Sequence, residues 1–423
     1  MTTNTNDEKI LQRWKTRNQL SPHTYKNYKS VIKHYTKCTG MSLHELYLEA
    51  IEEEEQGIPR YRRSIKDHLL DYYNYLDTTD LTETTKSSHI KIVRSFYKHL
   101  DIDIPNIQNK YEDTPIVEHN SKNITKELIK TMLDTATIRD KAILTLAALT
   151  GQSPDEIRHL TIQQLINCYN TELEHPVFTV EDIIKNQNKI LELPAPRLDM
   201  HRQKTKTNYW IYLPAEASKY IIGYLNERQY GDNSKLRING NNEPVFITKQ
   251  GKPFSMTAVG ALFTSLGKRC GFEQPENFND DIRMLLTRTG GEHRVWRAYN
   301  FRKYFINTCR RYAGTTEGSE FTFTGLELAD FWVGHKIKGS IKHYIQYNHD
   351  DVDYMQQQYL QVLPYLSLES EINELTTRDK REFLELKKQY DKLSEEMVLM
   401  KEYLESKAFV EKIESEMKNE FNK

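Results

Sequence analysis

Apolar residues in the first hundred positions recur every three or four residues, and this period most constrains the fold of the 423-residue chain. Ser21 and Pro22 have the residue types of an N-cap and a first-turn proline. The apolar positions that follow are Tyr25, Tyr28, Val31, Ile32 and Tyr35. This spacing places their side chains on one face of a helix. Further helices are predicted over 43–55, 62–76 and 82–100, so we expect a helical bundle domain over residues 8–105.

A linker and a second domain follow this bundle. Residues 106–123 are polar and contain Pro115, which is typical of a linker. The nearly continuous apolar run over 140–149 predicts a buried helix, and the aromatic and β-branched run over 209–213 predicts a strand. We therefore predict a mainly helical domain with a small β-sheet over residues 124–365.

The last part of the chain has a different pattern. From residue 383 onward, apolar residues alternate three and four apart, as in a coiled-coil seam. They are Phe383, Leu386, Tyr390, Leu393, Met397, Met400 and Leu404. Residues 366–423 are thus predicted to form an amphipathic or coiled-coil tail. It either binds a partner helix or folds back on the body, and both readings stay open.

Composition excludes some classes of protein and leaves others open. The formal net charge of -1 does not by itself indicate a nucleic-acid partner. No apolar run of about 18 residues is present and the start does not resemble a secretory signal, so we expect no membrane partner. Cys38, Cys168, Cys270 and Cys309 lie far apart without a C-x-x-C pair, which predicts reduced, buried thiols and a cytoplasmic location.

Four residue types that together cleave phosphodiesters occur in one order in the second domain. Residues 202–207 read Arg-Gln-Lys-Thr-Lys-Thr, Arg302 lies between aromatic residues, and Tyr344 follows the Gly334-His335 pair by nine positions. The order Lys, Arg, Gly-His, Tyr resembles the tyrosine recombinase, or phage-type integrase, family, in particular the integrases of archaea. Ser21-x-x-Thr24-x-x-x-Tyr28 and Arg94-Ser95-Phe96-Tyr97 are similar to the family's N-terminal core-binding domain.

The resemblance implies a site-specific recombinase that acts on double-stranded DNA as a homo-oligomer, a tetramer, without metal or cofactor. Tyr344 would be the nucleophile that forms a 3'-phosphotyrosyl link, with Tyr347 one helical turn away as its rival. Arg302 and His335 would stabilise charge on the scissile phosphate. Lys204 or Lys206 would protonate the leaving 5'-oxygen, and the sequence does not decide between them.

Further basic residues are predicted to contact DNA phosphates, most of them in the helical domain. They are Lys26, Lys29, Lys33, Lys86, Lys91, Arg94, Arg202 and Lys303. Solvated helix faces are the alternative explanation for those in the first domain.

Two positions depart from the family pattern. Ser153 stands where the family has its first arginine, two residues after Thr150-Gly151 and three before Glu156. Tyr299 stands where a histidine is usual, and its phenol, with a pKa of about 10, is a poor acid-base group near neutral pH. These departures keep open the alternative of a non-catalytic DNA-binding protein of the same fold. The tail 366–423 keeps open another, an interaction scaffold built around it.

Overall fold

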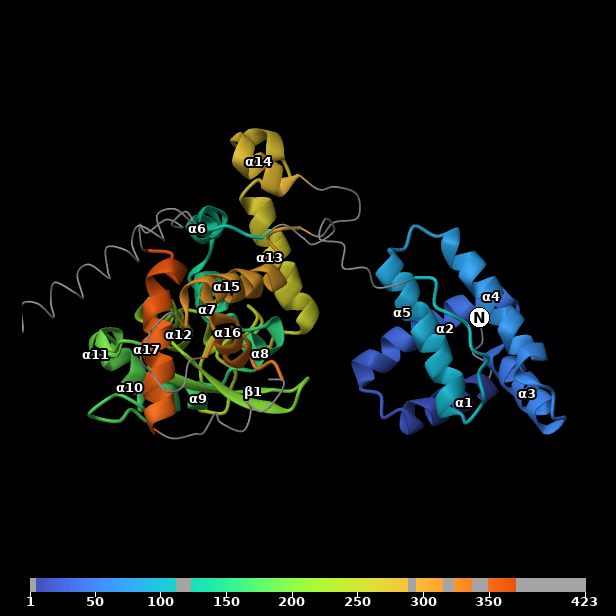
Figure 1. The fold of residues 1–423 in the computed structure, drawn as a ribbon. Helices are drawn as coiled ribbons and strands as arrows, with labels where there is room; N and C mark the ends of the chain where they lie inside the picture. Colours follow the sequence, from blue (N-terminus) through green and yellow to red (C-terminus); the bar gives the residue numbers. More distant parts are fainter. Residues whose placement is uncertain (1–4, 112–122, 288–293, 315–322, 337–348, 370–423) are drawn as a thin grey trace, which may run out of the picture. The chain divides into compact units, whose positions relative to one another are not determined.

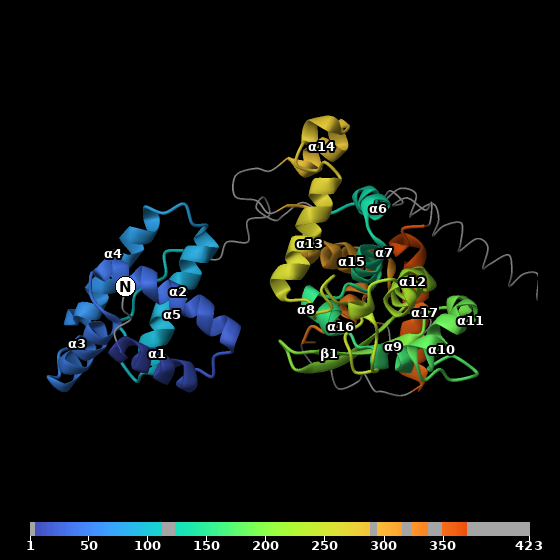
Figure 2. The same cartoon turned by 180° about the vertical axis from the view of Figure 1, so that it is seen from behind.

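The computed structural model describes residues 5–111, 123–287, 294–314, 323–336 and 349–369. The chain divides into two compact units, Met1–Asn120 and Ser121–Lys423, each with its own hydrophobic core. Figures 1 and 2 show both units from opposite sides. Tyr344, Tyr347 and the predicted coiled-coil seam lie outside the described residues.

The first unit is entirely helical in its described part. Helix α1 precedes the four helices that the apolar period predicts, and its residue Trp14 is fully buried. The predicted N-cap is confirmed, because Ser21 Oγ accepts a hydrogen bond from the Thr24 amide at 3.2 Å. The helices are α1 (Thr5–Arg17), α2 (Pro22–Thr39), α3 (Leu43–Glu55), α4 (Ser64–Asp77) and α5 (Glu83–His99), with a 3₁₀ turn at Arg60–Arg62.

The second unit is built around α7 (Ile138–Thr150), in which every residue from Ala142 to Thr150 is buried. This matches the apolar run that predicted a buried helix. Helices α12 (Ala215–Tyr230) and α15 (Ala298–Tyr312) pack against it. The remaining helices are α6 (Lys126–Thr135), α8 (Pro154–His159), α9 (Ile162–Tyr169), α10 (Val180–Lys185), α11 (Gln187–Glu192), α13 (Met256–Arg269), α14 (Asp280–Leu286), α16 (Gly325–Trp332) and α17 (His349–Leu366).

One antiparallel hairpin is the sheet of this unit within the described residues. Strand β1 (Arg197–Arg202) pairs with β2 (Thr207–Tyr212), and Arg202 lies opposite Thr207 at the turn. Strand β2 holds most of the predicted strand 209–213, and its residues are buried from Tyr209 onward. The prediction of a mainly helical fold with a small sheet is confirmed.

The predicted thiols differ in their burial. Cys168 and Cys309 are buried, but Cys38 and Cys270 are only partly covered, so the prediction is wrong for these two. Both stand at the end of a helix, where fewer neighbours surround a side chain. None of the described helices combines the length and the apolar character needed to cross a membrane.

Candidate active site

The turn after α16 is the point at which the predicted site residues meet. Gly334 has a φ of 65° there, and its amide donates to the Phe331 carbonyl at 2.8 Å. A Cβ atom at position 334 would lie 2.6 Å from Cε1 of Tyr209 on β2. Both the left-handed backbone and the close approach of the tyrosine ring therefore require glycine at this position. The turn leaves the carbonyl groups of Val333 and Gly334 available to side chains from other elements.

Arg302 reaches this turn from α15. Its side chain is buried, and its guanidinium donates to the Gly151 carbonyl at 3.1 Å and to the Val333 carbonyl. Gly151 is the C-cap of α7, so one arginine ties the ends of two helices together. Burial lowers the pKa of Arg302, and the nearby Glu156 carboxylate opposes this shift. The guanidinium nevertheless stays charged at neutral pH, because arginine ordinarily loses its proton only far above that pH.

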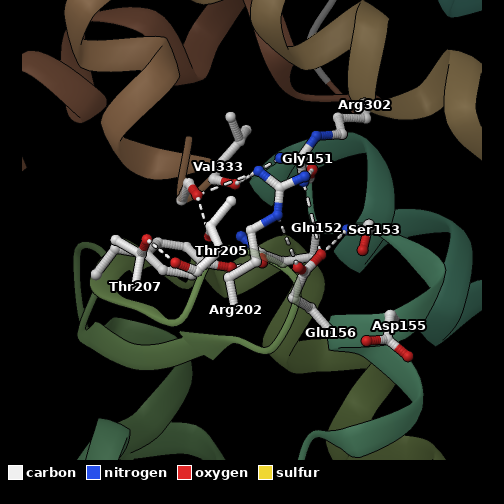
Figure 3. A network of polar contacts seen from close by, with 12 residues as sticks. Gly151, Gln152, Ser153, Asp155, Glu156, Arg202, Thr205, Thr207, Arg302 and Val333 are labelled. Atoms are coloured by element: carbon white, nitrogen blue, oxygen red, sulfur yellow. Dashed lines mark hydrogen bonds and ion pairs between the residues drawn. The ribbon is translucent and has the colours of Figure 1, made fainter. Parts of the chain in front are cut away.

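Arg202 reaches the same turn from the end of β1. Its Nη1 donates to the Gly334 carbonyl at 3.1 Å and to the Val333 carbonyl at 3.4 Å. In the hairpin turn that follows, Thr205 Oγ1 donates to the Gly334 carbonyl at 3.2 Å. Two hairpin residues, Arg202 and Thr205, thus hold the turn at Gly334 (Figure 3). Lys204 lies between them in the sequence, so the hairpin turn brings it to the same region.

Glu156 of α8 lies between the two arginines. Its Oε1 is 3.5 Å from Arg202 Nε and its Oε2 is 3.6 Å from Arg302 Nη1, with only 4% of the side chain exposed. Oε2 also accepts the Ser153 amide at 2.7 Å, which fixes the carboxylate against the start of its own helix. In the view of Figure 3, Arg302 lies above and Glu156 below the guanidinium of Arg202.

The buried side-chain amide of Gln152 connects the segments around the turn at Gly334. The Tyr209 hydroxyl donates to Gln152 Oε1, and Gln152 Nε2 donates to the carbonyls of Thr150 at 3.1 Å and Trp332 at 3.3 Å. Burial raises the pKa of Tyr209 far above its ordinary value, so this phenol stays protonated and keeps its role as donor. The loop after α7, β2 and the end of α16 are therefore locked to one another.

His335 lies at the rim of this arrangement with 38% of its side chain exposed. Its Nδ1 is 2.7 Å from Asp330 Oδ1, and its amide donates to the Asp330 carbonyl at 2.9 Å. Burial is the main cause that lowers the pKa of His335. The Asp330 carboxylate raises it, while Arg302 and Arg202 lower it further. The carboxylate contact at Nδ1 leaves Nε2 as the nitrogen for an external partner.

The structure brings together Arg302, His335 and the hairpin that carries Lys204 and Lys206. Both lysines are exposed, and Lys206 has a left-handed φ of 52°. Tyr344 and Tyr347 cannot be placed because they lie outside the described residues. Their roles, and those of the two lysines, stay predictions.

The predicted DNA-contacting residues differ in their surroundings. Lys26, Lys33 and Lys91 are exposed. Three others make contacts that the structure places within the protein. Lys29 pairs with Glu8, Lys86 is buried above the Tyr111 ring, and Arg94 donates to the Ile107 carbonyl at 2.7 Å. On α15, Lys303 Nζ lies 5.7 Å from the ring centre of Tyr299. Contact of these residues with phosphate stays a prediction.

The sequence pattern assigned no role to Gln152, Glu156 and Asp330. Glu156 stands at a position of the family pattern, but its link to Arg202 depends on a hairpin 46 residues away. Asp330 precedes His335 by five residues, a spacing that is not diagnostic on its own. Within the described residues, no group of three or more His, Cys, Asp or Glu side chains is arranged to hold a metal ion.

Among the known proteins compared with this chain, only solved structures match it. No protein-family model matches the sequence, and no curated protein matches it. Among solved structures, XerH recombinase bound to a palindromic difH substrate after cleavage is 13% identical, covering 84% of this chain and 97% of its own, with a TM-score of 0.45.

Two further matches are of the same kind. A lambda integrase dimer bound to a COC' core site is 13% identical, with 88% of this chain and 80% of that chain covered and a TM-score of 0.41. XerA recombinase is 15% identical, with coverages of 83% and 98% and a TM-score of 0.31. The three solved proteins are thus named as recombinases or an integrase.

Proposed function

We propose that the protein is a site-specific DNA recombinase that cleaves and rejoins duplex DNA through a 3'-phosphotyrosyl intermediate. One observation carries the proposal. Arg302, Arg202 and the Lys204 hairpin all attach to the carbonyls of the turn that presents His335. The hairpin, α15 and the turn at Gly334 are three distant parts of the chain, and an ordinary structural contact would not require a cation from each of them. Phosphate chemistry does require several donors around one anion.

The roles follow from the chemistry of the groups. Tyr344 attacks phosphorus as the phenolate, having given its proton to solvent, and the bond from phosphorus to the 5'-oxygen of the next nucleotide breaks. That oxygen leaves as a hydroxyl after it gains a proton from Lys204 or Lys206. Arg302 binds the non-bridging oxygens, whose charge grows in the transition state, and His335 donates from Nε2. The tyrosyl ester keeps the energy of the broken bond, so rejoining needs no nucleotide cofactor.

The wider assignments belong to the same proposal. Double-stranded DNA is the partner, contacted in the first unit by the exposed Lys26, Lys33 and Lys91. Exchange between two sites needs four protomers, and the tail 366–423 is proposed to help them associate. The protein then acts in the cytoplasm, on DNA.

The test is capture of the covalent intermediate. Duplexes that the protein retains from a random-sequence library supply the site, and a nick placed beside the scissile phosphate lets the freed strand end diffuse away. We expect a protein–DNA adduct that resists denaturation and disappears in Tyr344→Phe. If the adduct still forms in Tyr344→Phe but is lost in Tyr347→Phe, Tyr347 is the nucleophile. Absence of any adduct from the wild-type protein on these duplexes refutes the enzyme.

A non-catalytic DNA-binding protein is the second candidate. Ser153 favours it, since this residue offers no guanidinium and its amide is engaged by Glu156. Loss of one arginine from a phosphate clamp typically costs a factor of about 100 or more in rate. Tight binding that weakens steeply with salt, with no adduct on the nicked duplex, is the result expected from this candidate.

A further inference from the structure

The missing arginine at position 153 poses a question about charge. Ser153 is the N-cap of α8, and its amide is held by Glu156 Oε2 at 2.7 Å. A clamp formed by Arg302 alone would offer one guanidinium to a phosphate whose two non-bridging oxygens gain charge in the transition state. The second guanidinium must come from elsewhere if the protein is to cleave at a useful rate.

Two arginines lie close enough in the chain or in space to be considered. Arg158 is bound within its own helix, where Nη2 is 2.7 Å and Nε 2.8 Å from Asp155 Oδ1. Arg202 instead shares two partners with Arg302, the Val333 carbonyl and the Glu156 carboxylate, one oxygen of which faces each arginine. The two guanidinium groups of Arg202 and Arg302 are therefore neighbours (Figure 3).

The charges around this pair do not balance. Two guanidinium groups face one buried carboxylate, so the cluster retains one net positive charge at a site of low exposure. Each arginine also disfavours protonation of His335. A single anion bound beside Arg202, Arg302 and His335 would relieve this repulsion. A phosphodiester carries one negative charge, and its two non-bridging oxygens match the planar donors of arginine.

We propose that Arg202 is a catalytic residue that supplies the second guanidinium to the scissile phosphate, in place of the residue at position 153. The inference rests on the proposed function, because it concerns the same reaction. It assigns to a strand residue of the hairpin the role that the family pattern gives to the loop after α7. Glu156 then holds both arginines, one with each oxygen.

The experiment compares two nicked duplexes with the selected site, one with an ordinary scissile phosphate and one with a methylphosphonate there. The methyl group replaces one non-bridging oxygen and removes the negative charge, so a second guanidinium has less charge to stabilise. On the phosphate, Arg202→Ala is expected to form the adduct about 100-fold more slowly than wild type. On the methylphosphonate, the same variant is expected to form the adduct less than about tenfold more slowly than wild type.

Arg158→Ala is the matched control, since it removes an arginine of the same segment that is bound to Asp155. It is expected to cleave both duplexes at the wild-type rate. If Arg202→Ala does not fold, Arg202→Lys replaces it. The rate of adduct formation relative to wild type is then measured for this variant on both duplexes.

The outcomes separate this inference from the proposed function. An equal loss for Arg202→Ala on both duplexes assigns Arg202 a structural role and overturns the inference. Wild-type rates for Arg202→Ala on the ordinary phosphate overturn it as well, and in both cases the recombinase proposal stands. Absence of an adduct from the wild-type protein overturns the proposed function itself, and the inference falls with it.

Discussion

His335 and Asp330 show how one residue pair at the site balances opposing effects. Burial and the two arginines disfavour the protonated imidazole, whereas the Asp330 carboxylate at 2.7 Å favours it. Because the net effect lowers the pKa, the unfolded chain binds more protons than the folded chain just below the ordinary histidine pKa of about 6.5. The contribution of His335 to stability is therefore present above that pH and declines as the pH falls through this window.

Titration by NMR tests this balance at the residue scale, with no need for DNA. The imidazole signal of His335, assigned with His335→Gln, is expected to titrate at a lower pH in the folded protein than histidines do in the urea-unfolded chain. Asp330→Asn removes the carboxylate that accepts from Nδ1 of this ring, so it is expected to lower the midpoint further. A midpoint that rises in Asp330→Asn would contradict the stabilising effect of Asp330 on the protonated ring.

At the scale of elements, the hairpin β1–β2 bears on which lysine would reach the proposed phosphate. Arg202 and Thr205 are both attached to the Gly334 carbonyl, and Lys204 lies between these two anchors. Lys206 lies beyond the second anchor and has a left-handed backbone that disfavours a side chain. The attachment on both sides favours Lys204 as the group with a fixed position, and hence as the acid.

A substrate with sulfur in place of the leaving 5'-oxygen tests this choice, because a thiolate leaves without a proton. Lys204→Ala is expected to slow adduct formation by about 100-fold on the ordinary duplex and to approach wild type on the sulfur duplex. Lys206→Gly is the control. It is expected to keep its cleavage rate and to raise the free energy of unfolding by up to about 1 kcal/mol, since glycine adopts the left-handed conformation freely. If the sulfur duplex instead restores the cleavage rate of Lys206 variants and not that of Lys204 variants, Lys206 is the acid.

The elements themselves were accessible to sequence reasoning to different degrees. Helix α3 begins and ends at the predicted residues 43 and 55, because Ser42 and Glu45 form a capping box that marks its start. Strand β1 gave a weaker signal, since only Leu198 and Met200 alternate inward among polar residues. The contacts of Arg302 with main-chain carbonyls leave no trace in the residue pattern, so the convergence on the turn at Gly334 could not be predicted.

At the scale of the whole molecule, the chain has two separate cores. Trp14 packs in the first, where it stacks on Tyr28 at 5.3 Å and meets the edge of Phe96 at 5.5 Å. The other three tryptophans, Trp210, Trp296 and Trp332, belong to the second core. Each unit thus has its own optical probe, and the buried residues of the first core all come from the first unit.

A fragment ending at Tyr111 is expected to fold alone. Residues 1–111 contain every described residue of the first core, so the fragment should unfold cooperatively in urea and show the blue-shifted emission of a buried tryptophan. Trp14→Phe in the fragment serves as the spectral blank. Emission typical of solvent-exposed tryptophan, with no cooperative transition, would show that the first core needs the rest of the chain.

The carbonyl contacts at the turn also affect how such a protein changes during evolution. A main-chain oxygen is present whatever the amino acid, so the hydrogen bonds that Arg202 and Arg302 donate to the Val333 carbonyl do not by themselves fix the identity of residue 333. Glycine is required at 334 by its backbone and by Tyr209, and at 151 by a φ of 65° and by the ring of Phe305. A lineage that uses this arrangement can diverge far in sequence while the positions of its arginines persist.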